Sequence, residues 1–105
     1  MVTRHRVASL GDIAPGTLKR VEVGGVLVCL ARTEDGGLHA INDVCTHEHS
    51  SLSEGTLEGV EVECPTHSSL FDVRSGAVTS PPATTPVASY ATVVVGEDVF
   101  VEIEP

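Results

Sequence analysis

The sequence predicts an all-β protein: an antiparallel β-sandwich or barrel base that carries a small, loop-rich subdomain. Two observations favour this class. Short segments rich in Val, Ile, Leu and Thr recur along the chain, and turns that contain Gly or Pro separate them. No segment shows the apolar period of a helix of useful length. The length of 105 residues favours a single domain, residues 1–105.

The first part of the chain is expected to supply four strands of the base. Gly24-Gly25 is a two-residue hairpin signal between the second and third of them. The third strand is almost entirely apolar and is therefore expected to be buried on both faces, with Cys29 as a small buried hydrophobic residue. These expected strands span residues 6–10, 17–23, 26–32 and 38–41.

The composition changes between residues 43 and 83. Gly and Pro interrupt this part, and only short strands are expected in it, at residues 56–57, 60–63 and 70–73. Residues 87–95 and 99–103 then return to a β-branched strand composition. The sequence therefore predicts a basal β-domain from residues 1–42 and 84–105, and a loop-rich insertion, residues 43–83, held on that base.

Two clusters of Cys and His mark the insertion. The first is Cys45-Thr46-His47, and after sixteen residues Cys64-Pro65-Thr66-His67 follows. Structural zinc sites usually pair like ligands within one arm, whereas each arm here offers one thiolate and one imidazole. A dinuclear iron–sulfur cluster uses this set better, with the thiolates on one iron and the imidazoles on the other. A structural zinc module for protein interaction stays an alternative.

These motifs resemble the two cluster-binding motifs of Rieske proteins, in which two His replace two Cys on one iron of a 2Fe–2S cluster. The surrounding Leu52-Ser53-Glu54-Gly55 and Ser75-Gly76 are similar to those of Rieske-type ferredoxins of bacterial aromatic-ring-hydroxylating dioxygenase systems, and residues 51–57 resemble the carbazole dioxygenase group. The resemblance implies a Rieske fold and one 2Fe–2S cluster. It implies this ligand set: Cys45 and Cys64 on one iron, His47 and His67 on the other.

By the same resemblance the protein is a soluble one-electron carrier. It would take electrons from an NAD(P)H-dependent flavoprotein ferredoxin reductase and pass them to the terminal oxygenase of the dioxygenase system. It is then no enzyme by itself, since nothing in the sequence suggests a second iron site with two His and a carboxylate. The alternative within the family is the small Rieske subunit of a nitrite reductase, a group whose members often lack the cluster ligands.

The formal net charge of −9 argues against nucleic acid as a partner, because phosphate binding needs Lys and Arg. Residues 1–42 carry a net charge of +1, residues 43–83 of −6 and residues 84–105 of −4. This bias indicates either a solvated surface or a negative face that steers docking onto a basic partner. No apolar run could span a membrane and no secretory signal is visible, so a cytoplasmic monomer is expected.

Two positions after the second Cys, Ser68 and Phe71, depart from relatives. Ser68 stands where many relatives carry Gly, so we expect a backbone there that does not require Gly. Rieske proteins of cytochrome bc complexes commonly carry Ser and Tyr where Ser69 and Phe71 stand, and Phe71 lacks the hydroxyl that raises the potential. The expected midpoint therefore lies near the bottom of the class range of about −150 to +300 mV. His49 is interpreted as a loop residue and not as a fifth ligand.

Overall fold

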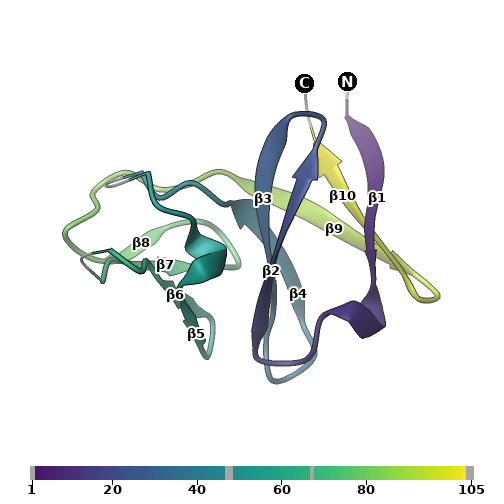
Figure 1. Cartoon of the computed structure of the whole chain (residues 1–105), viewed down its shortest axis with the longest axis horizontal. Helices are drawn as coiled ribbons and strands as arrows, with labels where there is room; N and C mark the ends of the chain where they lie inside the picture. Colours follow the sequence, from purple (N-terminus) through teal and green to yellow (C-terminus); the bar gives the residue numbers. More distant parts are fainter. Residues whose placement is uncertain (1, 47–48, 67, 104–105) are drawn as a thin grey trace.

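The structure is a computed structural model that describes residues 2–46, 49–66 and 68–103. Within these residues the chain forms ten β-strands and two short 3₁₀ helices, so the expected all-β class is confirmed. The strands make two antiparallel sheets that lie side by side (Figure 1). The elements are β1 (Thr3–Ser9), η1 (Leu10–Asp12), β2 (Thr17–Val23), β3 (Val26–Arg32), β4 (Leu38–Asn42), η2 (Leu52–Glu54), β5 (Thr56–Glu58), β6 (Glu61–Glu63), β7 (Leu70–Asp72), β8 (Val78–Ser80), β9 (Ser89–Val95) and β10 (Asp98–Ile103).

The larger sheet has six strands in the order β1-β10-β9-β4-β3-β2. Both ends of the chain contribute to it, and the two termini lie beside each other in Figure 1. Its apolar side chains and Ile13, which follows η1, form one buried cluster that includes Val28, Leu30, Val99 and Val101. Burial of this cluster stabilises the sheet through the hydrophobic effect. The sheet thus gives the rest of the chain a rigid base.

The β2–β3 hairpin forms where the Gly pair predicts it. Gly24 and Gly25 both have positive φ, +57° and +85°, which side chains other than Gly adopt only at a cost. Strand β3 is buried on both faces, as expected, and Cys29 is fully buried. Cys29 pairs with Ile41 of β4 and belongs to the apolar core beneath the smaller sheet.

Strand β1 differs from its prediction, since it begins at Thr3 and ends at Ser9, and residues 10–12 form η1 instead. Its first half is polar, so strand composition does not reveal it. Pairing with β10 holds it, and two ion pairs span the strands: Arg4 with Glu102 at 2.9 Å and Arg6 with Asp98 at 2.8 Å. Opposite charges across an antiparallel pair stabilise it modestly.

The smaller sheet has four strands in the order β5-β6-β7-β8, and β8 was not expected from the sequence. Gly55 begins this sheet at a close approach, because a Cβ atom there would lie 1.8 Å from the carbonyl oxygen of Glu63. Any larger residue would push β5 away from β6. Between the sheets lies a second buried apolar cluster that includes Leu52, Phe71, Cys45 and Cys64.

Among the residues that the structure describes, no helix is long and apolar enough to cross a membrane.

Candidate metal centre

The first arm of the candidate centre is a closed loop between Val44 and Ser51. These two residues pair as an isolated antiparallel β-bridge. Inside the bridge the Cys45 amide donates a 2.8 Å hydrogen bond to the Ser50 carbonyl oxygen, and the His49 amide donates a 2.9 Å hydrogen bond to the Cys45 carbonyl oxygen. These two bonds satisfy the amides of Cys45 and His49 and the carbonyls of Cys45 and Ser50, while the buried Cys45 side chain lies in the apolar core.

The second arm repeats this construction. Glu63 of β6 pairs with Leu70 of β7, and inside that pair the Cys64 amide donates a 2.8 Å hydrogen bond to the Ser69 carbonyl oxygen. The Cys amide thus bonds the carbonyl five residues later in both arms. The arms have the same length although the motif His stands two residues after Cys45 and three after Cys64.

Each arm turns on one residue in the left-handed backbone region, four residues after its Cys. His49 has φ +58° and Ser68 has φ +61°. Ser68 thus adopts a backbone that favours Gly without requiring it, which agrees with the expectation that Gly is not required there. The physical reason is the loop itself, because closing from Cys64 to Ser69 needs a reversal at position 68, and Ser adopts it at a cost.

Ser68→Gly is expected to stabilise the protein by about 0.5 to 1 kcal/mol. Gly adopts the left-handed backbone region without the steric cost that Ser has there, and this gain is partly offset because Gly loses more conformational entropy on folding. The midpoint of urea unfolding, followed by circular dichroism, should rise. Ser75→Gly is the matched control, since Ser75 is exposed in a loop of the same sheet and φ there is not positive. The control should lower the midpoint, and an equal fall in both variants would contradict the strain at Ser68.

The two motif thiols lie together in the core. Cys45 is 0% and Cys64 1% exposed, and both pack in one apolar cluster with Phe71. Burial raises the pKa of the Cys64 thiol, the Thr66 amide that hydrogen-bonds the sulfur lowers it, and the neighbouring Cys45 thiol raises it again. The other two motif residues, His47 and His67, lie outside the described residues. The structure thus brings two of the four expected site residues together.

This thiol pair fits an iron–sulfur cluster. Two buried sulfurs in contact cannot both carry negative charge unless a cation lies between them. Iron supplies that charge, and thiolate is its usual ligand in such clusters. Among the described residues, no group of three His, Cys, Asp or Glu side chains could hold a metal ion elsewhere.

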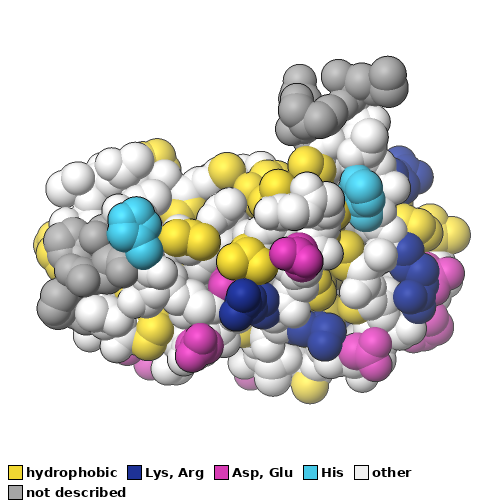
Figure 2. Space-filling view, turned by 45° about the horizontal axis from the view of Figure 1, so that its top comes forward, with side chains coloured by type: hydrophobic (Ala, Val, Ile, Leu, Met, Phe, Trp, Pro, Cys, Tyr) yellow, Lys and Arg dark blue, Asp and Glu magenta, His cyan; other side chains and the backbone are white. Residues whose placement is uncertain are grey.

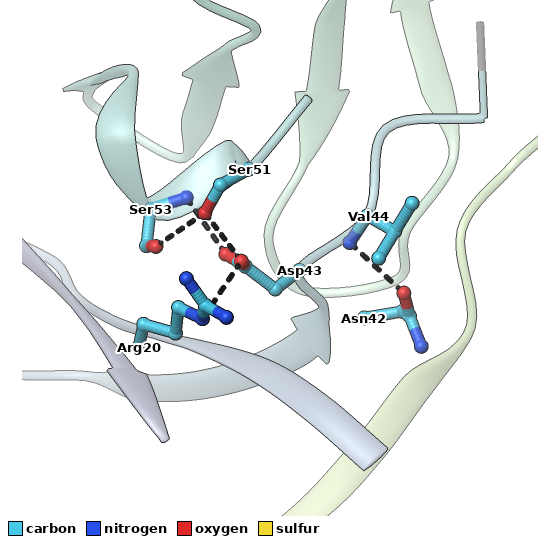
Figure 3. A network of polar contacts seen from close by, with 6 residues as sticks. All are labelled: Arg20, Asn42, Asp43, Val44, Ser51 and Ser53. Atoms are coloured by element: carbon cyan, nitrogen blue, oxygen red, sulfur yellow. Dashed lines mark hydrogen bonds and ion pairs between the residues drawn. The ribbon is translucent and has the colours of Figure 1, made fainter. Parts of the chain in front are cut away.

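A buried carboxylate fixes the first arm to both neighbouring elements (Figure 3). Asp43 is 1% exposed, and its Oδ1 accepts a 2.8 Å hydrogen bond from the Ser53 amide. Its Oδ2 accepts from the Ser51 hydroxyl and lies 3.7 Å from Nε of Arg20 on β2. In the sequence, Asp43 stands out only as one of the acidic residues of the insertion. An acidic residue directly after a buried strand and two residues before a ligand was the available signal.

The proline-containing loop at residues 81–86 contacts both arms. The Thr46 hydroxyl donates a 2.6 Å hydrogen bond to the Thr85 carbonyl oxygen, and the Ala83 amide donates a 3.0 Å hydrogen bond to the Ser69 hydroxyl oxygen. The Pro81–Pro82 bond in this loop is cis. Ser69, fully buried, therefore joins the second arm to this loop by its side chain and to Cys64 by its carbonyl.

Two further expectations, the burial of Cys29 and the loop position of His49, are confirmed. Cys29 is buried away from the arms on β3, and burial, together with the charge of Asp43, raises the pKa of its thiol to about 12. Such a thiol stays protonated and unreactive at neutral pH. His49 is an exposed loop residue, at the turn of the first arm.

Acidic side chains lie opposite one another on neighbouring strands of the smaller sheet, and their repulsion lowers its stability. Glu58 lies opposite Glu61 across β5 and β6, and Glu61 lies opposite Asp72 across β6 and β7. Asp72 is paired at 2.8 Å with Arg74, whose guanidinium holds the pKa of that carboxyl below its usual range.

On the face in Figure 2, Lys and Arg side chains gather over the centre and right, on the side of the larger sheet.

The β-sheet base presents two loops whose sequences each carry one Cys and one His, and two thiols lie buried at the root of these loops. This arrangement defines an iron–sulfur protein in which two thiolates and two imidazoles bind the irons. The small, loop-borne site is the type that electron carriers use. Comparison with known proteins agrees: the description Rieske [2Fe-2S] domain matches residues 3–91, and the chain belongs to this family. Its cofactor is accordingly one Rieske-type 2Fe–2S cluster.

Two relatives are similar over almost the whole chain. Ferredoxin CarAc of Metapseudomonas resinovorans is 39% identical over 97 residues, 91% of this chain and 90% of that one. The ferredoxin component of biphenyl 2,3-dioxygenase from Rhodococcus jostii is 39% identical over 101 residues, 94% of this chain and 92% of that one. Both are ferredoxins. The chain is thus an electron carrier and not itself a catalytic oxygenase.

Solved structures share the fold. The ferredoxin of carbazole 1,9a-dioxygenase from Nocardioides aromaticivorans superposes with a TM-score of 0.90 at 38% identity, covering 94% of this chain and 96% of that one. The ferredoxin in a complex with the oxygenase of carbazole 1,9a-dioxygenase gives 0.86 at 36%, covering 93% and 91%. A nitrite reductase small subunit from Mycobacterium tuberculosis gives 0.90 at 20%, covering 100% and 98%, which shows the fold alone.

Proposed function

We propose that this Rieske ferredoxin serves an aromatic-ring-hydroxylating dioxygenase, taking electrons from a flavoprotein reductase and delivering them to the terminal oxygenase. The observation that carries this proposal is the pair of buried thiols at the root of two loops built alike, in a chain 39% identical to ferredoxin CarAc and to the ferredoxin component of a biphenyl 2,3-dioxygenase. The nitrite reductase alternative has only a shared fold behind it. A cytoplasmic monomer is part of the proposal.

In this proposal Cys45 and Cys64 bind one iron, and His47 and His67 bind the other. The bound cluster accepts and releases one electron at a time. The chain keeps the thiolate side dry, because Phe71 and Leu52 pack around the two sulfurs. Donation from the Thr66 amide stabilises negative charge on the Cys64 sulfur. The residues around the thiols would therefore hold the 2Fe–2S cluster in place and exclude water from its thiolate side.

We also propose that residues 1–42 and 84–105 are the base and residues 43–83 the cluster-binding subdomain. The six-stranded sheet comes from the first set and the four-stranded sheet from the second, which supports this division. Asp43 then stands at the first boundary, where its carboxylate joins both parts. The subdomain would present one end of the molecule to its partners, and the base would stay out of the contact.

The test is direct transfer to a terminal oxygenase. The loaded ferredoxin, reduced with dithionite and then freed of it, is mixed with the oxidised oxygenase of carbazole 1,9a-dioxygenase in a stopped-flow instrument. The ferredoxin spectrum should return to its oxidised form as the oxygenase is reduced. A reduced ferredoxin that stays reduced with this oxygenase and with the biphenyl 2,3-dioxygenase oxygenase, but passes electrons to a nitrite reductase, would contradict the proposal.

The rate of reduction by a flavoprotein reductase is expected to fall with salt. Between about 0.01 M and 1 M ionic strength the Debye length falls from roughly 30 to 3 Å, and a steered association should slow roughly ten-fold. The double substitution Glu58→Gln with Glu61→Gln should lower the low-salt rate. The matched control changes Glu22 and Glu97, exposed on the base, to Gln. Equal rates at all salt concentrations would contradict steering by the smaller sheet.

A further inference from the structure

The smaller sheet has a free edge at β5. Among the described residues, β5 pairs with β6 on one side and with no strand on the other. The Val60 carbonyl and the Cys64 amide, on either side of β6, form hydrogen bonds with the residues that flank β7. Because bonding alternates along an antiparallel strand, Glu61 and Glu63 of β6 bond towards β5. The amide and carbonyl of Leu57, in the middle of β5, therefore point away from the sheet.

A groove lies along this edge, between β5 and the start of β2 (Figure 1). It has a volume of about 320 Å³ and is lined by residues 16–18, 53 and 55–57, none of which is charged. Leu18 and Leu57 supply its larger apolar side chains. Because β2 is the last strand of the larger sheet, the groove runs between two sheet edges. An extended segment of chain fits such a place better than a helix does.

A row of carboxylates crosses the other face of the smaller sheet and ends at this edge. Glu58 of β5 lies opposite Glu61 of β6, and Glu61 lies opposite Asp72 of β7. Asp72 is paired with Arg74, but within the described residues neither Glu58 nor Glu61 makes an ion pair. Like charges directly opposite each other destabilise a sheet. A cation on an added strand would relieve this repulsion, whereas a second copy of the chain would bring another row of carboxylates.

We propose that the free edge of β5 binds an extended segment of a partner protein in which basic and apolar side chains alternate. Successive side chains of a strand point to opposite faces. The basic ones would lie beside Thr56 and Glu58, and the apolar ones beside Leu57, facing the groove. The Leu57 amide and carbonyl supply the main-chain hydrogen bonds, as in other proteins that add a peptide to a sheet edge. None of these residues belongs to a ligand arm, so the inference does not rest on the proposed electron transfer.

Two end-blocked peptides of the same composition test this pattern by isothermal titration calorimetry with the cluster-loaded protein. One has the order Lys-Val-Lys-Val-Lys-Val-Lys, and the other has the order Lys-Lys-Lys-Lys-Val-Val-Val. The alternating peptide should bind roughly ten-fold more tightly, because only it places every basic side chain on the carboxylate face. Equal binding would mean that the acidic protein merely attracts cations, and it would overturn the proposal. An alternating peptide that does not bind would overturn it as well.

Hydrogen–deuterium exchange, read by mass spectrometry, locates the contact. The alternating peptide should slow exchange in residues 55–58 and leave β8, the opposite edge of the same sheet, unchanged. Slower exchange at β8 and not at β5 would overturn the assignment. Slower exchange at β5 on raising the protein concentration without peptide would also overturn it, because the edge would then bind a second copy.

Two matched variants test the charge. Glu58→Gln should weaken binding of the alternating peptide roughly three-fold, as the loss of one cross-strand charge pair implies. Glu97→Gln is the control, since Glu97 is exposed in the turn between β9 and β10, and binding should be unchanged. Equal binding by both variants would contradict a basic side chain beside Glu58.

Discussion

Purified Cys64→Ala protein is expected to be colourless and to contain no 2Fe–2S cluster. Cys64 is 1% exposed and lies beside the Cys45 thiol, so its removal would leave that iron with one thiolate. In this variant Cys45 is the one thiol left at the root of the arms among the described residues, and a single thiolate does not hold that iron. Iron and acid-labile sulfide content, with the visible spectrum, measure the result. Cys45→Ala should behave alike.

Cys29→Ala is the matched control for that loss. Cys29 is just as buried and belongs to the same apolar cluster, but it lies on β3 and its raised pKa keeps the thiol protonated. Its variant should keep the full content of iron and sulfide. A Cys64→Ala protein with a normal cluster, or a Cys29→Ala protein without one, would mean that the thiolate ligands are assigned wrongly.

Asp43→Ala is expected to lower the free energy of unfolding by roughly 3 kcal/mol, because two partly buried donors lose their buried acceptor and the side chain leaves a cavity. The donors are the Ser51 hydroxyl and the Ser53 amide (Figure 3). Urea unfolding of the loaded protein, followed by far-ultraviolet circular dichroism, gives the change. The cluster should also be lost at lower urea concentration, since the first arm is no longer fixed.

Arg20→Gln separates the hydrogen bonds of Asp43 from its ion pair. The Arg20 side chain is 51% exposed and its Nε lies 3.7 Å from Oδ2 of Asp43, so this pair should contribute less than about 1 kcal/mol. Arg20→Gln should therefore unfold almost as the unchanged protein does. If Arg20→Gln lowers the free energy of unfolding as much as Asp43→Ala does, the ion pair with Arg20 and not the hydrogen bonds of the first arm holds the carboxylate.

Features that depend on neighbours along the chain could be predicted from the sequence. Gly24-Gly25 predicts the β2–β3 hairpin because a two-residue turn needs positive φ at both positions, and both have it. The apolar run of β3 predicts burial on both faces for the same local reason. The spacing of Cys45 and Cys64 with their histidines predicts the kind of metal site, since ligand chemistry is carried by residue type.

Features that depend on contacts between distant segments could not. Strand β8 is short and ordinary in composition, and only pairing with β7 makes it a strand. The left-handed backbone at Ser68 follows from the length of a closed arm, which the unequal Cys-to-His spacings conceal. Asp43 acquires its role from partners eight and ten residues away and on another strand. Residue type alone does not reveal those partners.

One cluster is expected to be bound by a thiolate and an imidazole from each arm. Pulsed electron paramagnetic resonance of the reduced, loaded protein tests this ligation most directly, with the protein grown on ¹⁵N-labelled histidine. Two histidine nitrogens should couple to the reduced cluster, and the coupling from one nitrogen should disappear in each of His47→Cys and His67→Cys. A reduced cluster with no coupled histidine nitrogen, or a colourless protein that binds zinc instead, would contradict it.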